Sequence, residues 1–143
     1  MKLATIGYEA STLPDVITAL KGAGVELVID VRAVAASRRA GFSKTLLANS
    51  LREEGIEYVH LRQLGTPKPG RDAARAGDIA RMTRIFNDHL EEPAAQMELA
   101  QAVELATSRP SALLCYEADA GGCHRTIVAD RIKAAAGLEI VDL

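Results

Sequence analysis

Both cysteines of the chain and one of its three histidines fall within ten residues. Cys115 and Glu117 end an apolar run, a short Gly-rich loop follows, and Cys123, His124 and Arg125 open a helical pattern. A helix start lowers the pKa of a thiol and attracts anions, and a histidine exchanges a proton near neutral pH. The segment therefore predicts an acid–base or nucleophilic site in which Glu117, Cys123 and His124 are catalytic and Arg125 binds an anion.

Three better-defined types of site need a different spacing. A tyrosine-phosphatase loop has the pattern Cys-x5-Arg, but Arg125 lies ten residues after Cys115 and two after Cys123. A thioredoxin motif has two residues between its cysteines, and here there are seven. Zinc commonly takes four ligands in close pairs, and the adjacent Cys123 and His124 suit it poorly. We therefore expect no metal and no cofactor, and Cys115 alone fits a buried strand residue.

A second group of candidates follows another apolar run. Asp30 ends this run and Arg32 lies just beyond it. Arg32 can present its fork of donors to a phosphate or carboxylate, or it can pair with Asp30 and fix the loop. Further candidates for anion binding lie after this run and after the first apolar run of the chain: Gly7, Tyr8, Ser37, Arg38, Arg39, Ser43 and Lys44.

Two interpretations of the basic loop at residues 32–42 remain open. A helix that begins after Ser43 would offer free backbone amides to an anion. Alternatively, Ser43 only caps that helix and the neighbouring arginines are solvated. Residues 31–84 carry eleven Lys/Arg against five Asp/Glu, whereas the remainder carries six against fourteen. This asymmetry favours a local anion-facing surface over a protein that coats nucleic acid generally.

These candidates must be positioned by alternating strands and helices. The apolar, β-branched segments predict strands at residues 2–7, 25–31, 56–61, 111–116 and 138–143. Helical periodicity and caps predict helices at about 12–21, 43–54, 77–90, 93–108 and 123–136. The Gly/Pro-rich residues 62–76 predict a loop.

This order predicts one α/β domain over residues 1–143, with a mostly parallel sheet of about five strands and helices on both faces. In such sheets, ligands bind at the carboxyl ends of the strands. We therefore expect the candidate residues, which are far apart in sequence, to converge at that edge.

Composition limits the location of the protein. No stretch approaches the ~20 apolar residues of a membrane span, and the N-terminus predicts a strand rather than a signal peptide. We therefore expect a cytoplasmic protein without membrane contact. The chain is long enough to bury a sound core without cross-links, so both thiols are expected to be free.

Six segments together resemble a known family: TIGYE, IDVR, SRRAGFSK, GIEYVHLRQLG, LLCYE and CHR. In this order, over nearly the whole chain, they are similar to the family catalogued as domain of unknown function 488. The resemblance implies an α/β domain, and the positions that match the family's pattern are Thr5, Gly7, Asp30, Arg32, Ser37, Phe42, Glu117, Cys123, His124 and Arg125. One departure is Tyr8, where many relatives have histidine.

Our leading hypothesis is an enzyme that acts on a phosphate-bearing or other anionic ligand, such as a nucleotide or a nucleic-acid end, at the carboxyl edge. The alternative is a non-catalytic module that binds nucleic acid or a protein at the same edge. Three tyrosines and two phenylalanines provide few aromatic rings on which bases could stack. This disfavours a protein that binds single-stranded nucleic acid. A third hypothesis is structural: Asp30, Arg32 and Glu117 form a buried network that ties the strand ends together.

Overall fold

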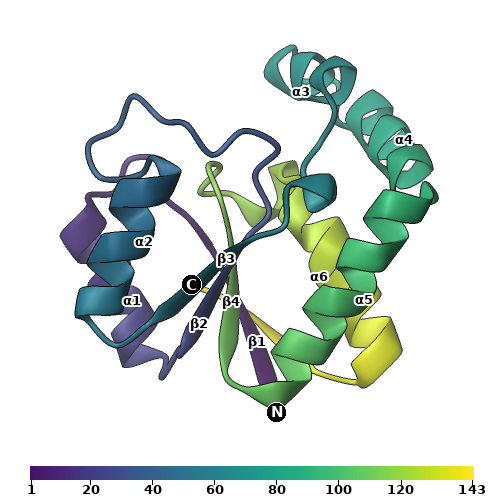
Figure 1. Ribbon diagram of the computed structural model, residues 1–143. Coiled ribbons are helices and arrows are strands. Elements are labelled where there is room, and N and C mark those ends of the chain that lie inside the picture. The colour runs from purple at the N-terminus through teal and green to yellow at the C-terminus, as the bar shows by residue number, and fades with distance from the viewer.

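The computed structural model describes residues 1–143 as a five-stranded parallel sheet with helices on both faces (Figure 1). The strands are β1 (Lys2–Gly7), β2 (Leu27–Asp30), β3 (Glu57–His60), β4 (Ser111–Cys115) and β5 (Glu139–Asp142). Their spatial order is β3-β2-β4-β1-β5, and every pair is parallel. The predicted α/β fold is therefore confirmed.

The two strands β2 and β4 are buried along their whole lengths. They pair with each other at the centre of the sheet, with Asp30 beside Leu114. Side chains that alternate along β2 and β4 enter two hydrophobic cores, one of 20 and one of 13 buried residues. A strand that is covered on both faces favours apolar residues on both, which explains why every residue of β2 before Asp30 is apolar.

The helices divide between the two faces of the sheet. The smaller core lies under α1 (Leu13–Gly22) and α2 (Lys44–Glu53). The larger core lies under α4 (Ile79–Leu90), α5 (Pro93–Ser108) and α6 (His124–Ala136). Figure 1 shows α1 and α2 on one side of the strands and α5 and α6 on the other. None of these helices combines the length and hydrophobicity that a membrane span requires.

One sequence prediction is wrong: residues 62–76 are not all loop. They contain a short 3-10 helix η1 (Arg62–Leu64) and a regular helix α3 (Lys68–Arg75). Proline in the first turn of a helix costs nothing, because the amide it lacks would have no partner there, so Pro69 starts α3 instead of preventing it. Gly70 is buried against Thr66 and Ile85, in a space that a β-carbon would not fit.

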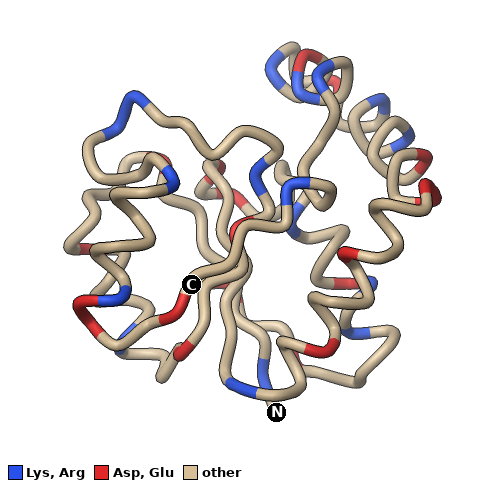
Figure 2. The backbone as a smooth tube through the Cα atoms, viewed as in Figure 1, with Lys and Arg blue, Asp and Glu red and all other residues tan.

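The basic part of the sequence lies around the carboxyl edge of the sheet. Figure 2 shows Lys and Arg on the loop that follows β2 and on α3 and α4, which extend beyond the strands at this edge. The loop after β4 reaches the same edge, because parallel strands all point the same way. The fold therefore places basic residues from the middle of the chain near the Cys115–Arg125 segment.

Candidate functional site

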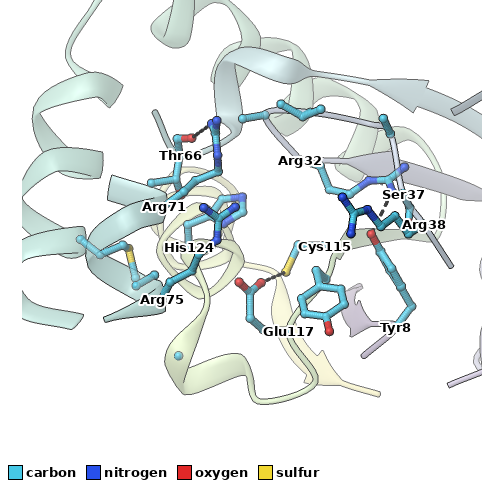
Figure 3. Close-up of a pocket in the computed structure, with 17 residues that line it drawn as sticks. Tyr8, Arg32, Ser37, Arg38, Thr66, Arg71, Arg75, Cys115, Glu117 and His124 are labelled. Atoms are coloured by element: carbon cyan, nitrogen blue, oxygen red, sulfur yellow. Dashed lines mark hydrogen bonds between the residues drawn. The ribbon is translucent and has the colours of Figure 1, made fainter. Parts of the chain in front are cut away.

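A pocket of about 620 Å3 lies at the carboxyl edge of the sheet (Figure 3). Its walls come from the ends of β1, β2 and β4, from α3 and α4, and from the start of α6. Six of the sequence candidates line it: Tyr8, Arg32, Ser37, Arg38, Glu117 and His124. The other six, which are Gly7, Arg39, Ser43, Lys44, Cys123 and Arg125, do not line this pocket.

Arg32 is buried and bound to the protein itself. Its Nε and Nη2 donate to the carboxylate of Asp30 at 2.9 and 2.7 Å, and its Nη1 donates to Tyr8 Oη and the Phe42 carbonyl. Burial alone would lower the pKa of Arg32, but hydrogen bonds to Asp30 and its charge raise the pKa above its ordinary value. The guanidinium therefore ties the ends of β1 and β2 together. This agrees with the alternative that the sequence left open, in which Arg32 pairs with Asp30 and fixes the loop.

The carboxylate of Asp30 has a second partner on the neighbouring strand. Tyr58 Oη on β3 donates to Asp30 Oδ2 at 2.5 Å. Burial, and then the charge of Asp30, raises the pKa of Tyr58 above its ordinary value. The Tyr58 hydroxyl therefore stays protonated and acts as a donor. Together Asp30, Arg32 and Tyr58 form a buried network across the edge of the sheet.

Tyr8 forms one wall of the pocket. Its ring stacks on Phe42 with the ring centroids 4.2 Å apart, and Tyr116 meets it edge to face at 5.4 Å. Its hydroxyl accepts the hydrogen bond from Arg32. Tyr8 is 3% exposed, so it shapes the pocket mainly as a packed aromatic ring.

The serines of the loop after β2 bind each other. Ser43 Oγ donates to the Ser37 carbonyl and accepts from the Ser37 amide, both at 3.1 Å. Ser43 stands at the N-cap of α2, but its side chain makes no capping bond. This pairing fixes the shape of the loop, and Lys44 begins α2 as an exposed residue outside the pocket.

The two adjacent arginines of this loop point to different places. Arg38 is exposed and lines the pocket, and none of the six close ion pairs of the structure includes it. Arg39 donates from Nη2 to the Ser11 carbonyl at 2.9 Å and lines a separate depression beside α1. Only Arg38 is therefore available to a ligand in the pocket.

Gly7 lies behind the pocket at a crossing of two backbone segments. A β-carbon at this position would overlap the Glu117 carbonyl and would also meet the guanidinium of Arg125. The amides of Tyr8 and Glu9 continue the pairing with Cys115 and Tyr116 beyond the strand ends. The need for glycine here comes from close backbone packing.

Arg125 is fully buried behind the pocket. Its Nη1 donates to Cys115 Sγ at 3.1 Å and to the Glu117 carbonyl, and its Nη2 donates to the Ala118 carbonyl at 3.2 Å. Its Nε has no hydrogen-bond partner, and no carboxylate forms an ion pair with it. Burial lowers the pKa of Arg125, while the more distant charges of Asp142, Glu117 and Asp119 oppose this.

A disulfide joins Cys115 and Cys123, so the expectation of two free thiols is wrong for this structure. The loop between them folds back, so that the end of β4 meets the start of α6. Sequence spacing alone does not reveal this approach. Their Cα atoms are 7.7 Å apart, somewhat wider than the usual 4.4–6.8 Å of disulfides, so the same backbone also has room for two separate thiols. Cys115 lines the pocket and Cys123 does not.

His124 is held as a neutral imidazole. Its Nε2 lies 2.6 Å from the Val31 carbonyl, which can only accept, so Nε2 carries the proton. Burial, aided by the charge of Arg125, lowers the pKa of His124 to about 4 despite this bond. Its Nδ1 faces Cys123 Sγ at 3.7 Å, and its ring packs edge to face on Phe86. His124 therefore connects α6 to the end of β2.

One group in this region has the chemistry of a metal site. The ligand atoms of Cys115, Cys123 and His124 all lie within 4.8 Å of one another. Two thiolates and a neutral imidazole suit a soft cation such as zinc. The disulfide occupies both sulfur atoms, however, and the buried charge of Arg125 touches Cys115, which disfavours a second cation there.

The arginines that α3 contributes to the pocket were not among the candidates that the sequence suggested. Arg71 and Arg75 are one helical turn apart and both line it. Arg71 donates to the Thr66 carbonyl at 2.9 Å, and Arg75 pairs at the surface with Asp72 at 3.3 Å. The i,i+4 spacing of two arginines is visible in the sequence, but the segment was predicted to be a loop.

Comparison with known proteins gives a family and no named relative. The family model described as domain of unknown function DUF488 matches residues 12–132 of the 143-residue chain. No curated protein and no solved structure matches the chain. The matched range includes the loop after β2, α3 and the segment from Cys115 to Arg125.

Proposed function

Because the chain belongs to the DUF488 family, whose description names no activity, we propose a function from the site itself: the pocket binds a small phosphate-bearing or other anionic molecule. Arg38, Arg71 and Arg75 supply the positive charge, and Glu117 is the group placed to move a proton. Arg32 in the pocket wall and Arg125 behind the pocket are bound to the protein itself and act as braces.

The observation that carries this proposal is the charge of the pocket lining. Three arginines, Arg38, Arg71 and Arg75, face one carboxylate, Glu117, because Arg32 is already neutralised by Asp30. Arg38 and Arg71 belong to no ion pair, and the Arg75 pair is at the surface, where screening makes it weak. Guanidinium groups that lack acidic partners are suited to the paired oxygens of phosphate and carboxylate groups.

The size of the pocket favours a small molecule over a nucleic-acid strand. A volume of about 620 Å3 falls within the ~300–1,000 Å3 that is usual for small-ligand sites. A protein that binds single-stranded nucleic acid would need a row of exposed aromatic rings along an open groove, on which the bases stack. Here Tyr8 is buried against Phe42, and Tyr116 is the one aromatic residue at the pocket that is well exposed.

Glu117 is the best candidate for proton transfer. It is half-buried, lines the pocket, and its Oε2 lies 3.5 Å from Cys115 Sγ. His124 also lines the pocket, but its protonated Nε2 is bound to Val31 and its Nδ1 faces Cys123. An enzymatic role of this pocket would therefore use Glu117 more directly than His124.

The experiment compares two arginines that are neighbours in sequence. Binding of inorganic pyrophosphate, AMP and citrate is measured by calorimetry for the wild type, Arg38→Ala and Arg39→Ala. We expect at least one of these anions to bind, and Arg38→Ala to weaken it about tenfold or more, as the loss of one charged hydrogen bond predicts. Arg39→Ala should change the affinity less than about twofold, because Arg39 faces Ser11.

Two results would contradict the proposal. One is the absence of binding for all three anions at millimolar concentration. The other is an equal loss of affinity in Arg38→Ala and Arg39→Ala, which would indicate a diffuse basic surface. Circular dichroism of each variant separates a loss of binding from a loss of folding.

A further inference from the structure

We propose that Cys115 and Cys123 form a redox-active pair that reduces a small hydroperoxide, with Cys115 as the attacking thiolate and Cys123 as the thiol that resolves the intermediate. This inference does not depend on anion binding, because hydrogen peroxide is uncharged. Four features carry it: the approach of the two sulfur atoms, the buried charge of Arg125, the position of Glu117, and the presence of Cys115 but not Cys123 in the pocket lining.

Arg125 lacks a counter-charge. This guanidinium is 0% exposed, and no acidic side chain forms an ion pair with it. A buried charge without a partner is costly. The one side-chain atom that the Arg125 guanidinium touches and that can become an anion is Cys115 Sγ, at 3.1 Å from Nη1. A thiolate on Cys115 supplies the missing negative charge, and a disulfide does not.

A proton acceptor lies beside the thiol of Cys115. Glu117 Oε2 lies 3.5 Å from Cys115 Sγ, on the pocket side (Figure 3). A carboxylate at this distance can take the thiol proton while Arg125 stabilises the sulfur anion from behind. Gly7 allows this arrangement, because any side chain there would displace the Glu117 carbonyl that Arg125 also holds.

Cys123 stands at the N-cap of α6, where its Sγ accepts the Arg125 amide at 3.5 Å, and it is 3% exposed. It does not line the pocket, so an oxidant that enters the pocket meets Cys115 and not Cys123. The two sulfur atoms meet in this structure, and a small shift of the loop between the cysteines would bring their Cα atoms from 7.7 Å to the usual disulfide range. Cys123 is therefore the resolving residue.

The reaction balances as follows. Cys115 gives its proton to Glu117, and the thiolate attacks one oxygen of the peroxide. The O–O bond breaks, Cys115 becomes a sulfenic acid, and the departing hydroxide takes the proton from Glu117 as water. The thiol of Cys123 then attacks Cys115 sulfur, the S–O bond breaks, and hydroxide leaves with the Cys123 proton as a second water. The dithiol and hydrogen peroxide thus give the disulfide and two waters, and a thiol reductant restores the dithiol.

The access route selects a small oxidant. Cys115 lines the pocket but is only 1% exposed. A hydroperoxide of a few atoms can approach a sulfur atom with so little exposed surface, whereas a bulky disulfide cannot align its two sulfur atoms with the thiolate.

The experiment uses the full chain, reduced and freed of reductant. Hydrogen peroxide is added at pH 7, and intact mass and iodoacetamide labelling follow the thiols with time. We expect loss of two thiols with no added oxygen, about tenfold or more faster than for free cysteine in the same buffer. Cys123→Ser should accumulate a sulfenic acid on Cys115 that dimedone traps, and Cys115→Ser should lose this fast reaction.

Arg125 is tested by thiolate titration in the Cys123→Ser background, followed by absorbance at 240 nm. Arg125→Met should move the Cys115 titration to higher pH and slow the peroxide reaction, while Arg125→Lys should restore part of both. Arg131→Met on the same helix is the matched control and should change neither, because Arg131 contacts Glu91 and Asn87 at the surface.

Three results would overturn the proposal. The first is a peroxide reaction of the wild type no faster than that of free cysteine. The second is sulfenic acid formation on Cys123 in preference to Cys115. The third is stoichiometric zinc on the reduced protein with both thiols protected from peroxide, which would make the pair a metal centre. None of these results touches the anion-binding measurement, so the two proposals fail separately.

Discussion

Asp30 and Arg32 lie two residues apart and bind each other through both carboxylate oxygens, at 2.9 Å to Nε and 2.7 Å to Nη2, with both side chains buried. Arg38, six residues further along, is exposed and unpaired at the same pocket. Two arginines of one loop therefore have different tasks. One stabilises the edge of the sheet, and the other is free to meet a ligand.

The first prediction concerns this buried pair. Asp30→Ala leaves Arg32 as an uncompensated buried charge and removes the partner of Tyr58, so we expect a loss of about 3–5 kcal/mol in the free energy of unfolding. Urea denaturation measures it. Glu54→Ala removes a surface pair with Lys21 and should cost less than about 1 kcal/mol. A loss in Asp30→Ala as small as in Glu54→Ala would mean that the network is not important for stability.

The second prediction concerns Gly7. The β-carbon of Gly7→Ala overlaps the Glu117 carbonyl, so the loop after β4 must move, at a cost of about 1–3 kcal/mol or more. Gly22→Ala is the matched control, because nothing surrounds its β-carbon and the residue ends a helix, where alanine is favoured over glycine. Thermal unfolding of both variants checks this expectation. Equal melting temperatures would show that the loop adapts freely.

The third prediction concerns pH. An unfolded histidine takes up its proton near pH 6.5, whereas folded His124 resists protonation until about pH 4. The neutral histidine therefore contributes stability above pH 6.5, and this contribution falls as the pH drops toward 4, by up to about 3 kcal/mol. His124→Gln can keep the donor to Val31 but does not titrate. Its unfolding free energy should decline less steeply over this range, and parallel pH profiles would contradict the burial of a neutral imidazole.

The fourth prediction concerns salt. If Arg38 and its neighbours on α3 bind an anion at an open pocket, added NaCl screens and competes with that attraction. The affinity for pyrophosphate should fall about tenfold or more between about 0.05 and 0.5 M NaCl. The variant Arg71→Gln should show a shallower dependence. A salt-independent affinity would point to a binding mode governed by uncharged groups.

The local sequence does not determine the directions in which the side chains of Arg38 and Arg39 point. Arg38 and Arg39 are adjacent and identical, yet one faces the pocket and the other faces Ser11 on the loop before α1. Their directions depend on a loop that Ser37 and Ser43 pin together, and on the packing of this loop against another part of the chain. Composition and charge could predict a basic surface but could not assign the two residues.

The sequence by itself determined the order of the elements and the edge at which the site lies. The largely apolar strands β2 and β4, the residue Thr12 that caps α1 and the left-handed Gly137 that ends α6 act within a few residues, so they can be recognised locally. The rule that parallel strands end at one edge then brought Arg32, Glu117 and His124 together.

Only the tertiary structure decided what each of these residues touches. His124 meets the Val31 carbonyl 93 positions away in sequence, and Arg125 loses its solvent because β1, β4 and α6 close around it. The approach of Cys115 to Cys123 depends on how the intervening loop folds against Gly7. Hydrogen bonds, burial and charge compensation arise from the simultaneous packing of distant segments, and no local pattern of residue types contains that information.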